Sequence, residues 1–285
     1  MSYQILSLKY RPQSFGDLAG QDHIAKTLVN AFTKDRVSQA YVLTGPRGVG
    51  KTTTARIIAK ALNCSVNEAG NPCGDCKSCD EITKGNNLDV LEIDGASNRG
   101  IEEIRNLREQ IKYAPMNGKY KIFIIDEVHM LSKQAFNGLL KTLEEPPEKL
   151  KFILATTEVR KIPVTVLSRC QRFDLKRVSL VAISKHLKEI CTIEKGNVTD
   201  QALNIISRAS EGSVRDAVSL LDRTLIHQSL KPNQTIDAKE VRDMLGLVDK
   251  SKLINLLGFV FKGDQKNTLK VFKEIFDDGL DLSLI

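Results

Sequence analysis

The chain has 285 residues with 42 Lys and Arg against 35 Asp and Glu, a formal net charge of +7, and 41% of its residues are hydrophobic. This composition excludes a disordered chain, and no run of 18 apolar residues is present to cross a membrane. With 5% aromatic residues and no Trp, any contact with nucleic acid should be to phosphates rather than to stacked bases. The first residues lack the regions of a secretory signal, so we expect a cytoplasmic protein with no membrane partner.

The first half of the chain predicts an α/β fold. Apolar runs typical of strands covered on both faces lie at 40–44, 89–94, 121–126 and 151–155, with a weaker one at 171–175. Helical patterns separate them. One begins at Lys51, and another runs from about Ser132 to Glu145, before Pro146. Strands that alternate with helices predict a five-stranded parallel sheet.

From about residue 178 onwards, only helical patterns occur. Apolar stripes at helical spacing lie at 180–190, 214–225, 253–260 and 269–276. We therefore expect three parts: an α/β domain over 1–178, a helical domain over 179–242, and the start of another helical domain over 243–285.

A phosphate-binding motif follows the first predicted strand. Its residues are Gly45, Pro46, Arg47, Gly48, Val49, Gly50, Lys51 and Thr52, which match G-x-x-x-x-G-K-[ST] between a strand and a helix. Backbone N–H groups of such a loop close around phosphate oxygens, Lys51 is expected to reach the β- and γ-phosphates, and Thr52 to bind Mg²⁺. The predicted nucleotide site also includes Thr53. The alternative is a glycine-rich turn that matches by chance.

Two acids end the most apolar strand. Asp126 is the expected Mg²⁺ ligand beside Thr52, and Glu127 is placed to act as general base on the attacking water. The alternative is a solvated acidic pair. His129 could be a base, a metal ligand or a surface histidine. A surface or helix-contact role is favoured, because the site already has its acid and metal ligands.

Four cysteines cluster in the sequence as C-x8-C-x2-C-x2-C: Cys64, Cys73, Cys76 and Cys79. In a reducing compartment such a cluster predicts metal ligands rather than disulfides. Four thiolates close a tetrahedral structural Zn²⁺ site and leave no open position for catalysis. Four separate surface thiols are the alternative. Cys170 and Cys191 are expected in or near the core.

Several motifs together carry a family resemblance. Asp-Glu-Val-His at 126–129, with the phosphate-binding loop, resembles the AAA+ ATPases. Residues 9–21 resemble the adenine-side motif of clamp loaders, Ser168-Arg169-Cys170 their SRC motif, and 212–217 the motif of the second sensor arginine. With the cysteine insert at 64–79, the chain resembles the tau/gamma family of bacterial DNA polymerase III clamp-loader subunits from residue 1 to about 247.

The resemblance implies an AAA+ P-loop NTPase fold with a small zinc-binding insert at 64–79, a helical lid domain over 179–242 and the start of a helical collar over 243–285. It also implies roles for residues outside the loop. Tyr10, Arg11 and Pro12 would contact the nucleotide. Thr157 would be the first sensor, with Thr156 as the alternative. Arg169 would be an arginine finger that acts on a neighbour's nucleotide, and Arg215 would reach the chain's own nucleotide.

Each of these roles has a structural alternative. Thr157 could cap a turn at a strand end, and Arg169 could pair with a nearby acid at the surface. Arg215 could form a helix-face ion pair with Asp216 or Asp222. Arg99 and Lys133 lie near predicted helix starts, where they could contact DNA phosphates or simply be solvated.

The function that the resemblance implies is an ATP-binding and hydrolysing motor subunit that loads the sliding clamp onto primed DNA during replication. The cofactors would be ATP, Mg²⁺ and Zn²⁺. The partners would be delta- and delta-prime-type subunits, copies of the chain itself, the sliding clamp, and primed DNA through its phosphate backbone. Polymerase and helicase would be contacted only through a carboxy-terminal region that this chain lacks. The alternatives are a non-hydrolysing scaffold subunit and a stand-alone AAA+ DNA helicase or recombination motor.

Overall fold

The computed structural model describes residues 4–66, 69–97, 109–111, 113–229, 235–246 and 250–277. The chain divides into two compact units. The first unit consists of Met1–Ile183 and Glu211–Asp216, and the second unit consists of Ser184–Ser210 and Ala217–Ile285. Among the described residues, no helix combines the length and the apolar character that a bilayer crossing requires.

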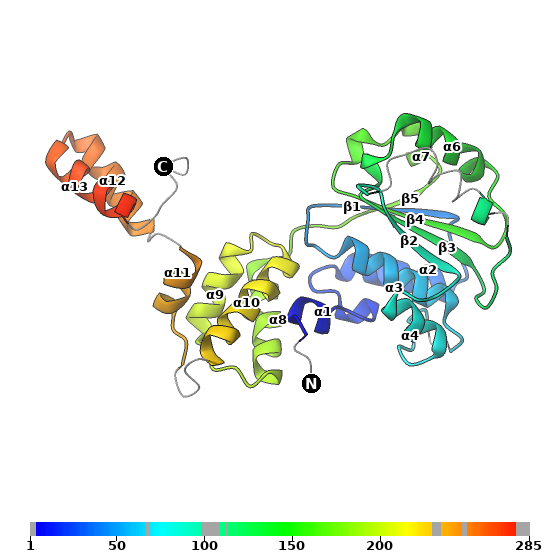
Figure 1. Ribbon diagram of the computed structural model, residues 1–285, viewed down its shortest axis with the longest axis horizontal. Coiled ribbons are helices and arrows are strands. Elements are labelled where there is room, and N and C mark those ends of the chain that lie inside the picture. The colour runs from blue at the N-terminus through cyan, green and yellow to red at the C-terminus, as the bar shows by residue number, and fades with distance from the viewer. Residues whose placement is uncertain are drawn as a thin grey trace. The chain divides into compact units, whose positions relative to one another are not determined.

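A parallel sheet forms the centre of the first unit (Figure 1). Its strands in the described residues are β1 (Ala40–Thr44), β2 (Val90–Asp94), β3 (Lys121–Asp126), β4 (Leu150–Thr156) and β5 (Gln171–Asp174), in the order β2-β3-β4-β1-β5. All neighbouring strands are parallel. The predicted five-stranded parallel sheet is therefore confirmed, with every strand end within one residue of its predicted place.

The strand order decides where the site lies. Because β1 is inserted between β4 and β5, the carboxyl ends of β3, β4 and β1 are neighbours at one edge of the sheet. Thr44 at the end of β1 is in register with Thr156 at the end of β4. In parallel sheets, ligands bind at this carboxyl edge, where the strand order reverses.

Helices cover both faces of the sheet. Figure 1 shows α2 (Asp22–Thr33), α3 (Lys51–Asn63) and α4 (Lys77–Lys84) on one side, and α6 (Lys133–Glu144) and α7 (Val164–Leu167) on the other. Successive strand side chains point to opposite faces: Ile122 and Ile124 of β3 join the core under α2 and α3, whereas Phe123 and Ile125 join the core under α6. Burial on both faces explains why the strands are almost continuously apolar.

The amino-terminal segment packs beside α2 and α3. It contains α1 (Leu6–Lys9) and the short 3-10 helix η1 (Phe15–Asp17), whose start carries a capping box between Ser14 and Asp17. Phe15 is 1% exposed and anchors the segment in the core. Burial of Phe15 holds the residues between α1 and η1 against α3.

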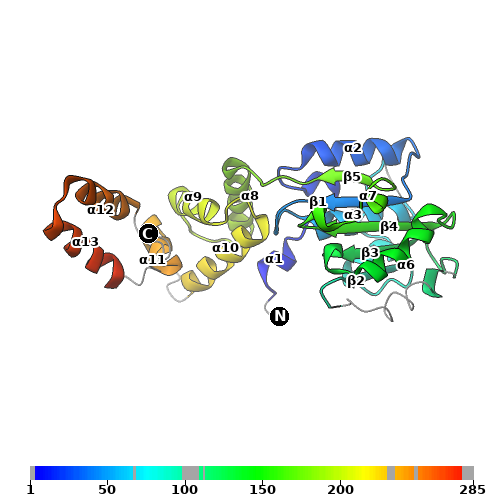
Figure 2. The same cartoon turned by 90° about the horizontal axis from the view of Figure 1, so that it is seen from above.

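The second unit contains helices. Its described elements are most of α8 (Leu180–Ile193) and α10 (Val214–Ser229), together with α9 (Asp200–Ala209), α11 (Ala238–Leu245), α12 (Lys250–Lys262) and α13 (Gln265–Asp277). Within this unit, α11 packs against α9 and α12 against α13, and Figure 2 shows the latter two side by side. Most residues of the apolar stripes of α8 and α10 are buried, as the pattern predicts, although Leu180 at the start of α8 is 47% exposed. In α12 and α13 the stripes leave Leu257, Val260 and Leu269 at least half exposed.

Candidate nucleotide site and four-cysteine cluster

The loop between β1 and α3 has the backbone that its glycines permit. Gly45 has φ 145° and Gly48 has φ 77°, both in the region that side chains disfavour. A Cβ atom on Gly45 would clash with the carbonyl of Leu175, and one on Gly48 would clash with the side chain of Ser213. The loop turns directly into α3 at Lys51, so the unpaired N–H groups of the first helical turn face the loop. This is an anion-binding geometry.

Lys51 is held across the loop. Its side chain is buried, and Nζ donates hydrogen bonds to the carbonyl oxygens of Gly45 and Pro46, both at 2.9 Å. Burial lowers the pKa of Lys51, whereas the charges of Glu127 and Asp126 raise it. The ammonium group is therefore close to both acids that the sequence predicted for the site.

Thr52 and Asp126 are brought together from α3 and β3. The Thr52 hydroxyl donates to Oδ2 of Asp126 at 2.5 Å, and Oδ1 of Asp126 accepts a hydrogen bond from the backbone N–H of Glu127 at 2.9 Å. Hydroxyl and carboxylate oxygens are the hard ligands that Mg²⁺ prefers. The donor set therefore fits the predicted magnesium site.

Glu127 follows directly at the end of β3, with a left-handed φ of 45°. Its Oε2 accepts a hydrogen bond from Oγ1 of Thr157 at 3.2 Å. Thr156, the alternative sensor, is buried, and its hydroxyl oxygen lies 3.0 Å from Nδ1 of His129 and accepts from the N–H of Glu158. Of the two threonines, Thr157 is the one that contacts the predicted base.

His129 makes a contact that the sequence did not predict. The surface interpretation is wrong, because its side chain is only 6% exposed. The 3-10 helix η2 (Val128–Met130) places Nδ1 3.4 Å from Oε2 of Glu127 and Nε2 3.4 Å from Oε1 of Glu158. The imidazole thus contacts the predicted base, and apart from the Asp-Glu-Val-His motif the sequence carried no signal for this.

The segment after α1 approaches the same helix. Arg11, Pro12 and Thr53 line one small cavity on the outer side of α3. Burial is the largest cause that lowers the pKa of the Arg11 guanidinium, and the charge of the nearby Arg56 lowers it further. Tyr10, which ends α1, has the ammonium of Lys9 5.4 Å from its ring centroid.

Two arginines of the predicted site differ in their surroundings. The backbone N–H of Arg215 donates to the carbonyl of Gly48 at 3.3 Å, so the start of α10 touches the phosphate-binding loop within the first unit. Arg169 donates from NH2 to Oε1 of Glu144 at 2.7 Å and from NH1 to the carbonyl of Thr165 at 2.5 Å. Neither Glu144 nor Thr165 belongs to the phosphate-binding loop, and an arginine that acts on another chain's nucleotide is expected to lie away from its own loop.

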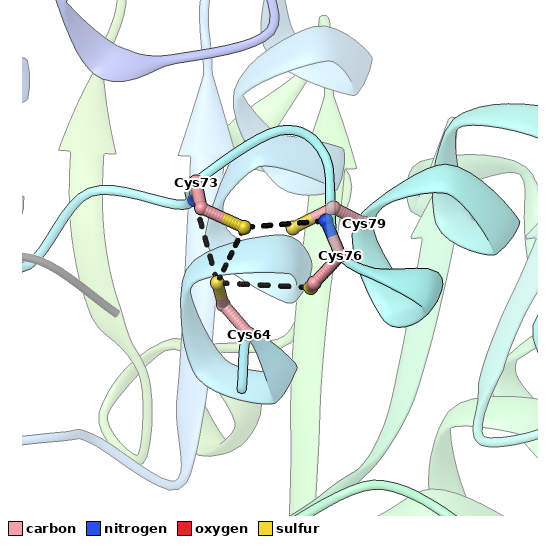
Figure 3. A group of neighbouring side chains, drawn as sticks. All are labelled: Cys64, Cys73, Cys76 and Cys79. Atoms are coloured by element: carbon pink, nitrogen blue, oxygen red, sulfur yellow. Dashed lines mark hydrogen bonds between the residues drawn. The ribbon is translucent and has the colours of Figure 1, made fainter. Parts of the chain in front are cut away.

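The four cysteines of the insert converge, as Figure 3 shows. Their sulfur atoms all lie within 4.8 Å of one another, with Cys64 Sγ 3.4 Å from Cys73 Sγ and 3.9 Å from Cys76 Sγ. A tetrahedral Zn²⁺ with Zn–S bonds of ~2.3 Å would place its sulfurs ~3.8 Å apart. Cys79, on α4, is completely buried. The cluster fits a structural metal site.

Backbone N–H groups point at sulfur atoms of this cluster, and burial raises the pKa of the Cys64 and Cys79 thiols. The N–H groups of Cys73 and Cys76 point at Sγ of Cys64 and Cys73, at 3.3 Å and 3.4 Å. Burial raises the pKa of the Cys76 thiol, but hydrogen bonds from the Cys79 backbone and from Ser65 outweigh it and lower that pKa to about 6. A thiolate is the form that binds metal.

The predicted DNA contacts fall in two places. Residues 98–105, with Arg99, lie outside the described part of the chain. Ser132 caps α6 by accepting a hydrogen bond from the N–H of Ala135 at 3.1 Å, and Lys133 is exposed at that helix start.

Comparison with known proteins places each part of the chain in one family. Residues 20–179 match the family described as DNA polymerase III, delta subunit, and 182–228 match the ATPase lid domain of the DNA polymerase III clamp loader subunit. Residues 236–285 match domain III of the DNA polymerase III subunits gamma and tau. Among solved structures, the Holliday junction branch migration motor RuvB of Thermotoga maritima superimposes with a TM-score of 0.63 at 18% identity, over 88% of this chain and 79% of that one. That likeness shows the AAA+ fold alone.

Sequence relatives agree with the family matches. The gamma subunit of DNA polymerase III from Buchnera aphidicola (subspecies Acyrthosiphon pisum) is 44% identical, over 99% of this chain and 77% of its own length. The tau subunits of Bacillus subtilis and Escherichia coli are 46% and 42% identical over 99% of this chain, which spans 49% and 43% of their lengths. The chain therefore belongs to the tau/gamma family of DNA polymerase III clamp-loader subunits.

Proposed function

We propose that this chain is an ATP-binding and hydrolysing motor subunit that drives the loading of a sliding clamp onto primed DNA. The observation that carries the proposal is the convergence of Lys51, Thr52, Asp126 and Glu127 at one edge of the sheet. A scaffold subunit that never hydrolyses ATP would not require a phosphate-binding lysine, magnesium ligands and a general base together. The partners are delta- and delta-prime-type subunits, further copies of this chain, the clamp, and the phosphates of primed DNA.

The residues divide the chemistry of hydrolysis among them. Lys51 and the N–H groups of the loop bind the phosphates of ATP. Thr52 and Asp126 would hold Mg²⁺, which neutralises phosphate charge when it is bound. Glu127 accepts a proton from water as the water oxygen bonds to the γ-phosphorus and the bond to the ADP oxygen breaks. The Thr157 hydroxyl keeps the Glu127 carboxylate in place.

The arginines supply charge from three directions. Arg11, with Tyr10 and Pro12, contacts the nucleotide from the amino-terminal segment. Arg215 contacts it from the start of α10, and the backbone bond between Arg215 and Gly48 supports this role. Arg169 leaves Glu144 and reaches the γ-phosphate bound by a neighbouring subunit.

The remaining parts serve structure and assembly. The four-cysteine cluster binds one structural Zn²⁺. The ATPase domain spans 1–178, the lid 179–242 and the start of the collar 243–285, and the family matches at 20–179, 182–228 and 236–285 support this division.

The test is ATP turnover by the chain alone and with other loader subunits, clamp and primed DNA, added singly and together. Strong stimulation by the full set is the expected result. No turnover in any mixture would instead support a scaffold subunit. Strand separation or branch migration without partner subunits would support a stand-alone motor.

A further inference from the structure

A buried ammonium group lies between the phosphate-binding helix and the cysteine insert. Lys60, on the last turns of α3, is 2% exposed. Its Nζ donates a hydrogen bond to Oε1 of Gln13, 47 residues earlier in the chain. An ammonium group without water is stable only when its partners replace the lost hydration. The contact between Lys60 and Gln13 is therefore a required feature of this part of the fold.

Gln13 connects Lys60 to the segment that we assign to the nucleotide. While its Oε1 accepts from Lys60, its Nε2 donates to the backbone carbonyl of Arg11 at 2.8 Å. The side-chain amide of Gln13 is thus held by one hydrogen bond at its oxygen and by another at its nitrogen. A change in the position of the Lys60 ammonium is transmitted directly to the backbone of Arg11.

The other side of Lys60 faces the insert. The helix that carries Lys60 ends at Asn63 and leads directly into Cys64, while α4 packs against α3 and carries the buried Cys79. A metal ion held by Cys64 and Cys79 would therefore tie the end of α3 to α4.

The insert also touches Gln13 through α4. Thr83 lies one helical turn after Cys79, donates to its carbonyl at 2.7 Å, and has its hydroxyl 3.4 Å from Oε1 of Gln13. A single small cavity is lined by Thr83 and Lys60 and also by Arg11 and Thr53, the residue that follows Thr52. The cysteine cluster and the phosphate-binding helix therefore share one continuous network of contacts.

We propose that Lys60 and Gln13 are positioning residues that couple metal binding in the four-cysteine insert to nucleotide affinity at the phosphate-binding loop. The proposal rests on the proposed function, because it takes the Arg11 segment to contact the nucleotide. With metal bound, α4 and the end of α3 are tied together, Lys60 and Thr83 hold Gln13, and Gln13 orders Arg11. When the metal leaves, α4 and the end of α3 are no longer tied together and the Arg11 segment loosens.

Coupling of this kind is reciprocal, and this makes it measurable without turnover. If metal strengthens nucleotide binding by some factor, nucleotide must strengthen metal binding by the same factor. We expect a factor on the order of 5 to 50. The affinity of the 285-residue chain for a fluorescent ADP analogue is measured with Zn²⁺ bound and after chelation. The Zn²⁺ affinity is measured by competition with a chromophoric chelator, with and without ADP.

Variants of Lys60 and Gln13 distinguish a positioning role of these residues from a general effect on the stability of the fold. Lys60→Met keeps the length of the side chain and removes its charge, and Gln13→Leu removes both hydrogen bonds. Each should bind the analogue as weakly as the metal-free wild type, and its affinity should no longer depend on Zn²⁺. Lys60→Arg, which retains the charge and the donors, should restore part of the dependence.

A matched control is available in the same domain. Lys151 is 3% exposed and its Nζ donates to Oε1 of Gln39 at 3.0 Å, the same chemical contact as that of Lys60. Lys151→Met should lower the thermal unfolding temperature by a similar amount yet leave the zinc dependence of nucleotide affinity intact. Amide hydrogen exchange of residues 5–14 should rise after chelation in the wild type and in Lys151→Met.

The outcomes separate this inference from the function on which it rests. Metal-free wild type that binds the analogue as tightly as the zinc form would overturn the coupling, as would a Lys60→Met variant that keeps the full zinc dependence. A wild type that binds no nucleotide, or binds it no better than Lys51→Ala does, would overturn the proposed function instead.

Discussion

The hydroxyl of Thr157 donates a hydrogen bond to Oε2 of Glu127 at 3.2 Å, and so joins the ends of two neighbouring strands. The hydroxyl of the adjacent Thr156 instead contacts Nδ1 of His129, at 3.0 Å. The proposed sensor and the proposed base are thus one hydrogen-bonded unit. A residue that positions a base should affect the chemical step more than ground-state binding.

We therefore predict that Thr157→Val lowers kcat of the assembled loader about 10- to 100-fold while the Kd for ATP stays within twofold. Single-turnover hydrolysis and equilibrium binding measure the two quantities. Thr165→Val, at an exposed threonine outside the site, serves as the control. If Thr156→Val lowers kcat and Thr157→Val does not, the sensor role passes to Thr156.

Lys51→Ala tests the phosphate site itself. The ammonium group of Lys51 contacts loop carbonyls rather than the apolar core, so its loss should leave the fold intact and weaken ATP binding at least about tenfold. Titration with a fluorescent nucleotide gives the affinity, and circular dichroism checks the fold. Equal affinity and equal turnover in the variant would contradict the assignment.

Much of this site could be predicted because its residues are close in sequence or follow strands. The loop at 45–52 and the acids at 126–127 each carry their own local pattern. Parallel strand order then brings them to one edge. The cysteine spacing likewise indicated a metal site that the sulfur positions fit.

Contacts between distant segments carry no such pattern. The bond between Lys60 and Gln13 spans 47 residues, and although Gln13 lies in the motif at 9–21, Lys60 belongs to no motif. The sequence favours a surface or helix-contact role for His129, because the predicted site already has its acid and its metal ligands. Its burial follows from how η2 folds back beside the end of β4, which periodicity cannot reveal.

Asp89 gives a pH-dependent test of stability. Its buried carboxylate accepts hydrogen bonds from the backbone N–H groups of Met116, Asn117 and Gly118 at 2.7, 2.7 and 2.6 Å. Burial raises the pKa of Asp89, but these donors and Lys121 outweigh it, so the pKa in the folded state is lowered. A lowered carboxyl pKa stabilises the fold above the unfolded-state pKa of about 3.9, and this contribution is lost as pH falls through the folded-state value.

Asp89→Asn should accordingly reduce the free energy of unfolding by about 2 kcal/mol at pH 7, because an amide NH₂ group would face N–H donors. The difference from wild type should shrink below about pH 4. Urea unfolding at pH 7 and below about pH 4 measures this difference in the free energy of unfolding. Asp80→Asn, at an exposed ion pair with Lys84, should change stability by less than about 0.5 kcal/mol, and an equal loss in both variants would contradict the account of Asp89.

The cysteine cluster predicts one Zn²⁺ per chain. Protein purified with reductant and without chelator should contain one equivalent by elemental analysis, and Cys76→Ser should lower that content. Because thiolates bind metal and thiols do not, zinc should be released as pH falls. Cys170→Ser, outside the cluster, should retain the full equivalent. Zinc-free protein from the same purification would contradict the site.

Arg169 is predicted to act on the nucleotide of a neighbouring subunit. In this chain its guanidinium is paired with Glu144, and the two side chains are 35% and 48% exposed. Exposed pairs contribute about 0–1 kcal/mol, so release from Glu144 costs little when a phosphate is offered instead. Arginine fingers change kcat by factors on the order of 10³–10⁵ in other phosphoryl-transfer enzymes. Arg169→Ala should therefore leave nucleotide binding by the isolated chain unchanged and strongly reduce turnover in the assembled loader.

Mixed assemblies give the sharper test of this finger. A subunit with Arg169→Ala should disable the site of its neighbour while its own site still turns over, whereas a subunit with Lys51→Ala should disable its own site. Arg172→Ala removes a comparable exposed arginine, paired with Asp174, and should do neither. Hydrolysis that depends on a neighbour's arginine would report correct assembly, so a lone chain should be a slow ATPase. If Arg169→Ala weakens nucleotide binding by the isolated chain as much as Lys51→Ala does, Arg169 belongs to its own site and the finger assignment is wrong.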